Sequence, residues 1–255
     1  MKKGVVLRTY ISNSFEEEFY QKFSGYVAQE FKGYYRKGVQ LPLYADSNEL
    51  EEAIRYLNQV KAQYILFSHT YFTKKEMDSI PFFYLRDTVA PLELEGDTIE
   101  NYGTKYVDGK LASDVLIDKK YLKKIKWGYL RPERVVSEEV KKIIEDNQLT
   151  GIKFESLVKD YKGREVDPYY VISFTNSLPP ISSKTWLRDG DNGVIYKNSE
   201  LYYEKEKLNG ALDFNLTFEH FNNWNMQYVI VTPKVKKVFK ENGLRLHFEP
   251  IILVD

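Results

Sequence analysis

One pattern of hydrophobic and polar positions occurs twice along the chain. Residues 135–149 read VVSEEVKKIIEDNQL, and residues 230–244 read IVTPKVKKVFKENGL. In each stretch an apolar pair precedes Ser or Thr, apolar residues then recur at helical spacing, and a second apolar segment containing Phe-Glu follows. Helical spacing between two short apolar runs is typical of a helix flanked by strands. The pattern therefore predicts two copies of a strand–helix–strand unit, over 135–155 and 230–249.

The residues at the ends of both predicted helices support this interpretation. Ser137 and Thr232 are good N-cap residues, because a side-chain oxygen there can accept a hydrogen bond from an amide of the first turn. Pro233 fits the first helical position, where no amide donor is needed. Gly243 supplies a left-handed stop after the second helix, and we expect Asn147 to do the same after the first.

The first half of the chain alternates between predicted strands and helices. An apolar run, GVVL, predicts a strand near the N-terminus. Apolar residues spaced by four over 15–31 predict a long helix that Ser14 opens through a capping box with Glu17. A second helix is predicted from Asn48. The continuous apolar run YILF at 64–67 predicts a strand that is covered on both faces.

These patterns predict an α+β fold with mixed sheets, and an α/β arrangement is the alternative for the N-terminal half. Regular patterning weakens after residue 86, so we place a boundary between about 105 and 130. We expect an N-terminal α/β region, 1–112, and a C-terminal α+β region, 113–255, that contains both copies. No Gly/Ser-rich or Pro-rich linker marks the boundary, so a single shared core stays open.

Composition and charge exclude several classes of function. The chain has 37 basic and 37 acidic residues, whereas nucleic-acid-binding proteins usually carry a basic excess that neutralises phosphates. Cysteine is absent, which removes disulfides, thiol nucleophiles and zinc–thiolate sites. The N-terminal sequence MKKGVVLRTY has no apolar run long enough for a signal peptide or a membrane span. We therefore expect a cytoplasmic protein without a nucleic-acid or membrane partner.

The sequence contains only weak candidates for reaction chemistry. His69 follows an apolar run at a predicted strand end, where catalytic groups occur, but a structural histidine is the better interpretation. An acidic cluster could place carboxylates together for metal binding or acid/base work: Glu93, Glu95, Asp97 and Glu100. Its alternation with leucine favours a half-buried strand with its charges in water. We predict no catalytic residue, no cofactor and no metal site.

The repeated element near the C-terminus resembles the ending of a known family. Val229–Thr232, the helix that follows, Asn242–Leu244 and the strand Leu246–Pro250 resemble the end of a bacterial immunity-protein family. That family is associated with polymorphic toxin systems and is typified by a myxobacterial immunity domain. The first copy, 135–154, resembles the same element. The stretch 71–106 also resembles uncharacterised bacterial relatives, some of which carry a Cys-x-x-Cys-Gly pair near 106–109, and this chain has no cysteine there. The resemblance covers about half of the chain and implies a protein that neutralises a toxin by binding it.

We interpret the chain as a non-enzymatic protein-binding protein of the toxin-neutralising kind. It contains 21 Tyr and 15 Phe, and protein interfaces concentrate aromatic and arginine anchors within a polar rim. The best local candidate is a predicted surface loop with Trp186, Arg188 and Asp189. The alternative is an enzyme or small-ligand-binding protein with a pocket between the two halves, which would use His69 or the acidic cluster.

Overall fold

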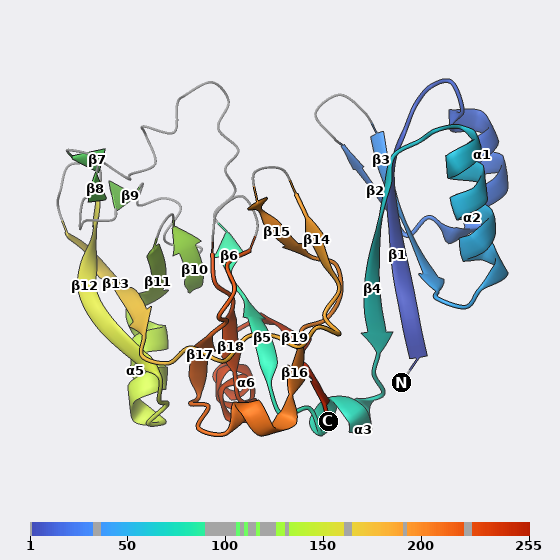
Figure 1. Ribbon diagram of the computed structural model, residues 1–255. Coiled ribbons are helices and arrows are strands. Elements are labelled where there is room, and N and C mark those ends of the chain that lie inside the picture. Colours follow the sequence, from blue (N-terminus) through green and yellow to red (C-terminus); the bar gives the residue numbers. More distant parts are fainter. Residues whose placement is uncertain are drawn as a thin grey trace. The chain divides into compact units, whose positions relative to one another are not determined.

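The structure is a computed structural model that describes most of the chain. It describes residues 2–32, 37–89, 106–107, 110–111, 116–117, 126–130, 133–160, 165–190, 193–221 and 226–255. The chain forms two compact units, each assembled from separate segments of the sequence (Figure 1). Unit 1 comprises Met1–Ser79 and Ser183–Leu201, and unit 2 comprises Ile80–Ser182 and Tyr202–Asp255. Residues 112 and 113, where the sequence predicted a boundary, lie outside the described residues, within the sequence span of unit 2.

Unit 1 is built on a βαββαβ arrangement. Its elements up to residue 79 are β1 (Lys2–Ile11), α1 (Glu16–Phe23), the 3₁₀ turn η1 (Ser24–Tyr26), β2 (Gln29–Lys32), β3 (Lys37–Tyr44), α2 (Asn48–Gln59), β4 (Tyr64–Tyr71) and α3 (Lys74–Asp78). The four strands form one antiparallel sheet in the order β2-β3-β1-β4. Each of α1 and α2 therefore joins two strands that are separated by a third, the split βαβ connection. Figure 1 shows both helices on the same face of the sheet.

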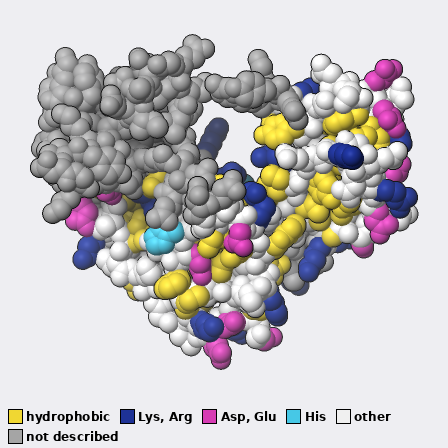
Figure 2. Space-filling model, turned by 45° about the horizontal axis from the view of Figure 1, so that its top comes forward, with side chains coloured by type: hydrophobic (Ala, Val, Ile, Leu, Met, Phe, Trp, Pro, Cys, Tyr) yellow, Lys and Arg dark blue, Asp and Glu magenta, His cyan; other side chains and the backbone are white. Residues whose placement is uncertain are grey.

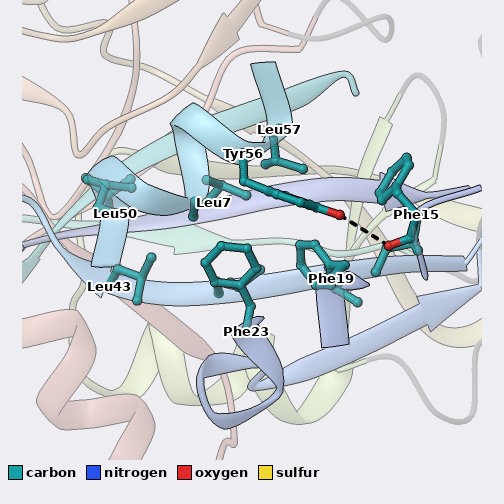
Figure 3. Packing of buried hydrophobic residues seen from close by; sticks show 13 residues of the cluster. Leu7, Phe15, Phe19, Phe23, Leu43, Leu50, Tyr56 and Leu57 are labelled. Atoms are coloured by element: carbon teal, nitrogen blue, oxygen red, sulfur yellow. Dashed lines mark hydrogen bonds between the residues drawn. The ribbon is translucent and has the colours of Figure 1, made fainter. Parts of the chain in front are cut away.

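The core of unit 1 lies between this sheet and its two helices (Figure 3). Alternate strand residues point to the helices, as the two-residue period of a strand requires. The buried cluster consists of Val5, Leu7, Ile11, Phe15, Phe19, Phe23, Val39, Leu41, Leu43, Leu50, Ala53, Tyr56 and Leu57. Phe19 and Phe23 of α1 pack against Tyr56 of α2 with ring centroids 6.3 and 5.6 Å apart. The hydroxyl of Tyr56 donates to the carbonyl oxygen of Phe15 at 3.4 Å, so this buried tyrosine is satisfied.

The helix predicted over 15–31 is shorter than expected. It ends at Phe23, and Phe31 lies in β2. A spacing of four places residues on one face of a strand as well as on one face of a helix. The apolar spacing therefore continues from α1 into β2, although the chain changes from helix to strand. The predicted capping box is also wrong, because Phe15 occupies the N-cap position and no side chain caps the helix.

Two other local predictions in unit 1 need correction. Ser47, one residue before the predicted start at Asn48, caps α2 and accepts a hydrogen bond from Leu50 N at 3.2 Å. The strand predicted at 64–67 extends to Tyr71, and its residues are half-buried instead of covered on both faces. The physical reason is that α1 and α2 cover only one face of the sheet, so alternate residues of β4 point away from the core.

Unit 2 contains two larger sheets. Its elements are β5 (Phe83–Arg86), β6 (Thr88–Val89), β7 (Tyr106–Val107), β8 (Lys110–Leu111), β9 (Leu116–Ile117), β10 (Trp127–Leu130), β11 (Glu133–Ser137), α5 (Glu138–Asp146), β12 (Ile152–Asp160), β13 (Glu165–Phe174), β16 (Tyr202–Glu204), η4 (Lys205–Leu208), β17 (Phe214–Leu216), β18 (Val229–Val231), α6 (Pro233–Glu241), β19 (His247–Pro250) and β20 (Ile252–Val254). The sheet orders are β6-β10-β11-β13-β12-β9 and β17-β18-β5-β19, and short pairs join β16 to β20 and β7 to β8. Helices and mostly antiparallel sheets confirm the predicted α+β class.

Both copies of the predicted repeat are strand–helix–strand units with the same topology. In β11-α5-β12 and in β18-α6-β19, the two strands lie on either side of a third strand that is antiparallel to both. That central strand is β13 in the first copy and β5 in the second. The registers also agree: Val135 pairs with Val171 and Phe154 with Ile172, while Ile230 pairs with Tyr84 and Phe248 with Leu85. The second copy is therefore completed by a strand from far upstream in the chain.

The two copies pack against each other through equivalent positions. Trp127 of β10 pairs with Val136 of the first copy, and Phe214 of β17 pairs with Val231 of the second. The rings of Trp127 and Phe214 stack with centroids 5.6 Å apart and planes inclined by 11°. Both side chains are fully buried. A shared aromatic stack at the centre of unit 2 thus joins the duplicated halves.

The helix starts of the two copies differ. Ser137 caps α5 as predicted, with its hydroxyl accepting from Val140 N at 3.4 Å. Thr232 occupies the N-cap position of α6, and Pro233 follows as expected, but Thr232 makes no capping bond. Its hydroxyl donates instead to Asp213 Oδ1 at 2.9 Å. The predicted capping hydrogen bond of Thr232 is therefore wrong, because its hydroxyl is hydrogen-bonded to the carboxylate of Asp213.

Of the two predicted helix stops, one is confirmed and one is wrong by a residue. Gly243 has φ of 73°, which confirms the left-handed stop after α6. In the first copy Gln148, with φ of 50°, takes the left-handed conformation, and Asn147 remains at φ of −95°. Asn147 is held there because its side-chain amide donates to the carbonyl of Ile143 at 2.9 Å. The prediction was thus one residue early.

Candidate functional site

The predicted site residues lie on a β-hairpin of unit 1. Its strands are β14 (Leu187–Asp189) and β15 (Ile195–Lys197), which pair antiparallel. Arg188 and Asp189 are therefore strand residues and not part of a surface loop, and Trp186 directly precedes the strand. The turn begins at Gly190, whose N–H donates to the carbonyl of Val194 at 2.7 Å. The prediction of exposure is confirmed: Trp186 is 42% exposed, and Arg188 and Asp189 are also exposed.

Backbone amides of β4 donate hydrogen bonds to the segment that directly follows this hairpin. Ser68 N donates to the carbonyl of Asn198 at 2.7 Å, and Thr70 N donates to the carboxylate of Glu200. Asn198 N in turn donates to the carbonyl of Trp186 at 2.9 Å. The backbone beneath Trp186 is thus held by the sheet of unit 1. A side chain on fixed backbone loses less conformational freedom when it binds a partner.

The guanidinium group of Arg188 stacks on an aromatic ring of the opposite strand. Its central carbon lies 4.6 Å from the ring centroid of Tyr196. A Cβ atom at Gly190 would lie only 2.4 Å from the same ring, so a larger residue there would require the ring to shift. Such cation–π contact holds Arg188 in place while it stays exposed. The hairpin therefore carries an exposed tryptophan and a positioned arginine.

The other predicted candidate, His69, lies beside Glu200 in the same unit. Burial lowers the pKa of His69, and the nearby Glu200 carboxylate partly opposes that shift. His69 Nδ1, Glu200 Oε2 and Asn198 Oδ1 are buried and have no hydrogen-bond partner in the described part of the chain. The sequence gives no sign that Glu200 and Asn198 lie near His69, because they follow it by about 130 positions.

The remaining site predictions concern acidic and metal-binding groups. The acidic cluster at Glu93, Glu95, Asp97 and Glu100 lies outside the described residues. Among the residues that the structure does describe, no three histidine, aspartate or glutamate side chains gather as a metal site would require. His69 lies beside one carboxylate of the described residues, that of Glu200, which is the only carboxylate found to affect its pKa.

Comparisons with known proteins give no further lead. No protein-family model, curated protein or solved structure matches the chain. Within the described ranges, none of the helices has the length and apolar character needed to cross a membrane. The function must therefore be inferred from the residues of the chain itself.

Proposed function

We propose that this protein is a non-enzymatic protein-binding protein that neutralises a toxin, in the manner of an immunity protein. The observation that carries the proposal is the β14–β15 hairpin with its exposed Trp186 and Arg188. Tryptophan and arginine supply much of the binding energy in protein interfaces. The resemblance of both repeat copies to an immunity-protein family supports a toxin as the partner. The chain's equal numbers of acidic and basic residues support a protein over a nucleic acid.

In this proposal the protein acts by covering the partner's active site. An interface of ordinary size buries about 1,600 Å² in total, and a few anchors dominate its energy. Trp186 supplies the apolar anchor, while Arg188 offers its guanidinium edge to a carboxylate or carbonyl of the partner. Asp189 lies next to them on the exposed hairpin and contributes to a polar rim. Toxin and immunity protein meet in the cytoplasm, without a cofactor or a membrane.

Replacing both Trp186 and Arg188 by alanine is expected to abolish capture of the partner. If each anchor contributes about 2 kcal/mol, the double variant binds roughly 1,000-fold more weakly. Its melting temperature should stay nearly unchanged, because both side chains are exposed. Affinity capture from the native cell with mass spectrometry measures the loss. Tyr26→Ala, which also removes an aromatic ring 42% exposed, is the matched control and should bind normally.

A specific observation favours a second candidate, a small-ligand-binding protein or enzyme that uses His69. Buried polar atoms without partners, such as His69 Nδ1 and Glu200 Oε2 among the described residues, are places where a ligand can complete the hydrogen bonding. The same capture experiment separates the two candidates. If the Trp186/Arg188 double variant captures its partner normally and His69→Ala does not, the histidine site becomes the better assignment.

A further inference from the structure

The sheet of unit 1 has a second face, opposite to α1 and α2, that is rich in aromatic side chains. Strand residues alternate between faces, so the neighbours of the buried core residues point to this side. The residues that define it, here called the aromatic face, are Arg8, Tyr10, Phe31, Tyr44, Phe67 and Tyr71. Three of its tyrosines are markedly exposed: Tyr10 by 44%, Tyr44 by 51% and Tyr71 by 43%. Figure 2 shows groups of hydrophobic side chains at the surface, with Lys and Arg among them.

The side chains of the aromatic face hold one another in place. The guanidinium carbon of Arg8 lies 4.9 Å from the ring centroid of Phe31 and 5.5 Å from that of Phe67. Tyr44 and Tyr71 meet edge to face with centroids 5.8 Å apart. These contacts fix rings and cation before any partner arrives, which lowers the entropic cost of binding.

Among the described residues of β1–β4, the charged side chains on this face have one sign, and the Glu200 carboxylate beside His69 is buried. Lys2 and Arg8 point to it, and no Asp or Glu of the described residues in β1–β4 does. Glu30 of β2 lies on the helix side, where it pairs with Lys37 at 2.9 Å. Glu200, at the edge of β4, is 8% exposed and accepts the Thr70 amide. The face is therefore locally basic, although the whole chain is neutral.

We infer that the aromatic face is a docking surface for the partner protein, and that the partner presents apolar side chains flanked by carboxylates to it. The inference rests on the proposed function and names the chemistry of the partner. Aromatic residues and arginine are enriched at interface cores, and acidic residues are depleted there. A complementary acidic surface would also steer the encounter. The segment that directly follows the hairpin of Trp186 is hydrogen-bonded to β4 of the same sheet, so one partner can reach both.

Two other occupants fit the face less well. A protein that binds nucleic acid tightly neutralises roughly 6–10 phosphates, and Lys2 and Arg8 are too few for that. A second copy of the chain, docked face to face, would bring like charges together, and like-charge contacts oppose association. A protein surface with apolar side chains and carboxylates can pack on the rings and pair with the cations.

Site-specific photocrosslinking tests the inference. The variants Tyr10→p-benzoylphenylalanine and Tyr71→p-benzoylphenylalanine probe the face, Trp186→p-benzoylphenylalanine probes the hairpin, and the same change at Tyr26 is the control. After irradiation in native lysate, the two face variants should crosslink to one foreign protein through a peptide that contains Asp or Glu. Arg8→Glu should then weaken binding of that protein at least tenfold, and replacing the crosslinked carboxylate by Arg should restore binding.

The contrary outcomes are distinct. Protein adducts at Trp186 without adducts at Tyr10 and Tyr71 overturn the docking face but leave the proposed function intact. Adducts of the face variants with a second copy, or Arg8-dependent binding of a fluorescent single-stranded DNA oligonucleotide at physiological salt, also overturn it. No foreign protein adduct at any position overturns both the docking face and the proposed function.

Discussion

Arg134→Met is expected to lower the free energy of unfolding by about 3–5 kcal/mol, because it leaves a buried carboxylate without its cation. Arg134 Nε donates to both oxygens of Asp87 at 3.2 and 3.0 Å, and Trp127 Nε1 donates to the same carboxylate at 2.9 Å. The side chains of Arg134 and Asp87 are only 9% and 1% exposed. Equilibrium unfolding in urea measures the loss. Arg188→Met, which removes an exposed arginine, is the matched control.

The pH dependence of this loss identifies its cause. Burial raises the pKa of Asp87, and Arg134 opposes the shift. Without the arginine the folded-state pKa rises further above the unfolded value of about 3.9. A carboxyl group whose pKa is raised on folding contributes stability at low pH that is lost as the pH rises through the folded pKa. The deficit of Arg134→Met relative to the wild type should therefore be smaller at mildly acidic pH than at neutral pH.

A double variant supplies the second control. Asp87→Asn combined with Arg134→Met removes both charges and should recover part of the stability that the single variant loses. Its own stability should no longer respond to titration at position 87, so its deficit relative to the wild type should not grow as the pH rises. Equal deficits of Arg134→Met at acidic and neutral pH would show that lost packing, and not the unpaired carboxylate, causes the destabilisation.

The repeat could be predicted from the sequence because the information that specifies it is local. In each of α5 and α6, the residues at the helix ends and the apolar stripe fall within a few turns of one helix. A helical period is recognisable over that length. The pairing of the central strand of the second copy could not be predicted, because nothing in β5 indicates that it pairs with strands more than a hundred residues later. Strand pairing over such distances depends on register and burial in the whole sheet.

The candidate site was predictable only in part, for the same reason. Trp186 and Arg188 stand beside the turn residues that follow them, so their exposure could be expected. Their hairpin could not, because strands of three residues are too short for a clear alternation. The aromatic face could not be predicted from the sequence either. Its Phe31 fitted a helical stripe equally well, since a spacing of four is common to both structures.

Gly151→Ala is expected to lower the free energy of unfolding by about 3 kcal/mol or more. Gly151 has φ of 93°, a conformation that other residues rarely adopt, and its Cβ would lie 2.1 Å from the carbonyl oxygen of Phe214. The adjacent Thr150 carbonyl accepts from Phe214 N at 2.9 Å, so β17 cannot move away without breaking that bond. At this point the first repeat copy meets the strand that precedes the second.

The loss at Gly151 has two causes, backbone strain and steric contact. A variant of Gly243, which ends α6 in the second copy, separates them. Its φ of 73° is also left-handed, but no neighbouring atom lies within 4 Å of an added Cβ. Gly243→Ala therefore carries only the backbone strain and should cost about 1 kcal/mol. Urea unfolding of both variants measures the difference, which isolates the steric contact between the copies. If the two variants lose the same stability, β17 can shift to accommodate the methyl group, and the junction between the copies is less rigid than its backbone contacts indicate.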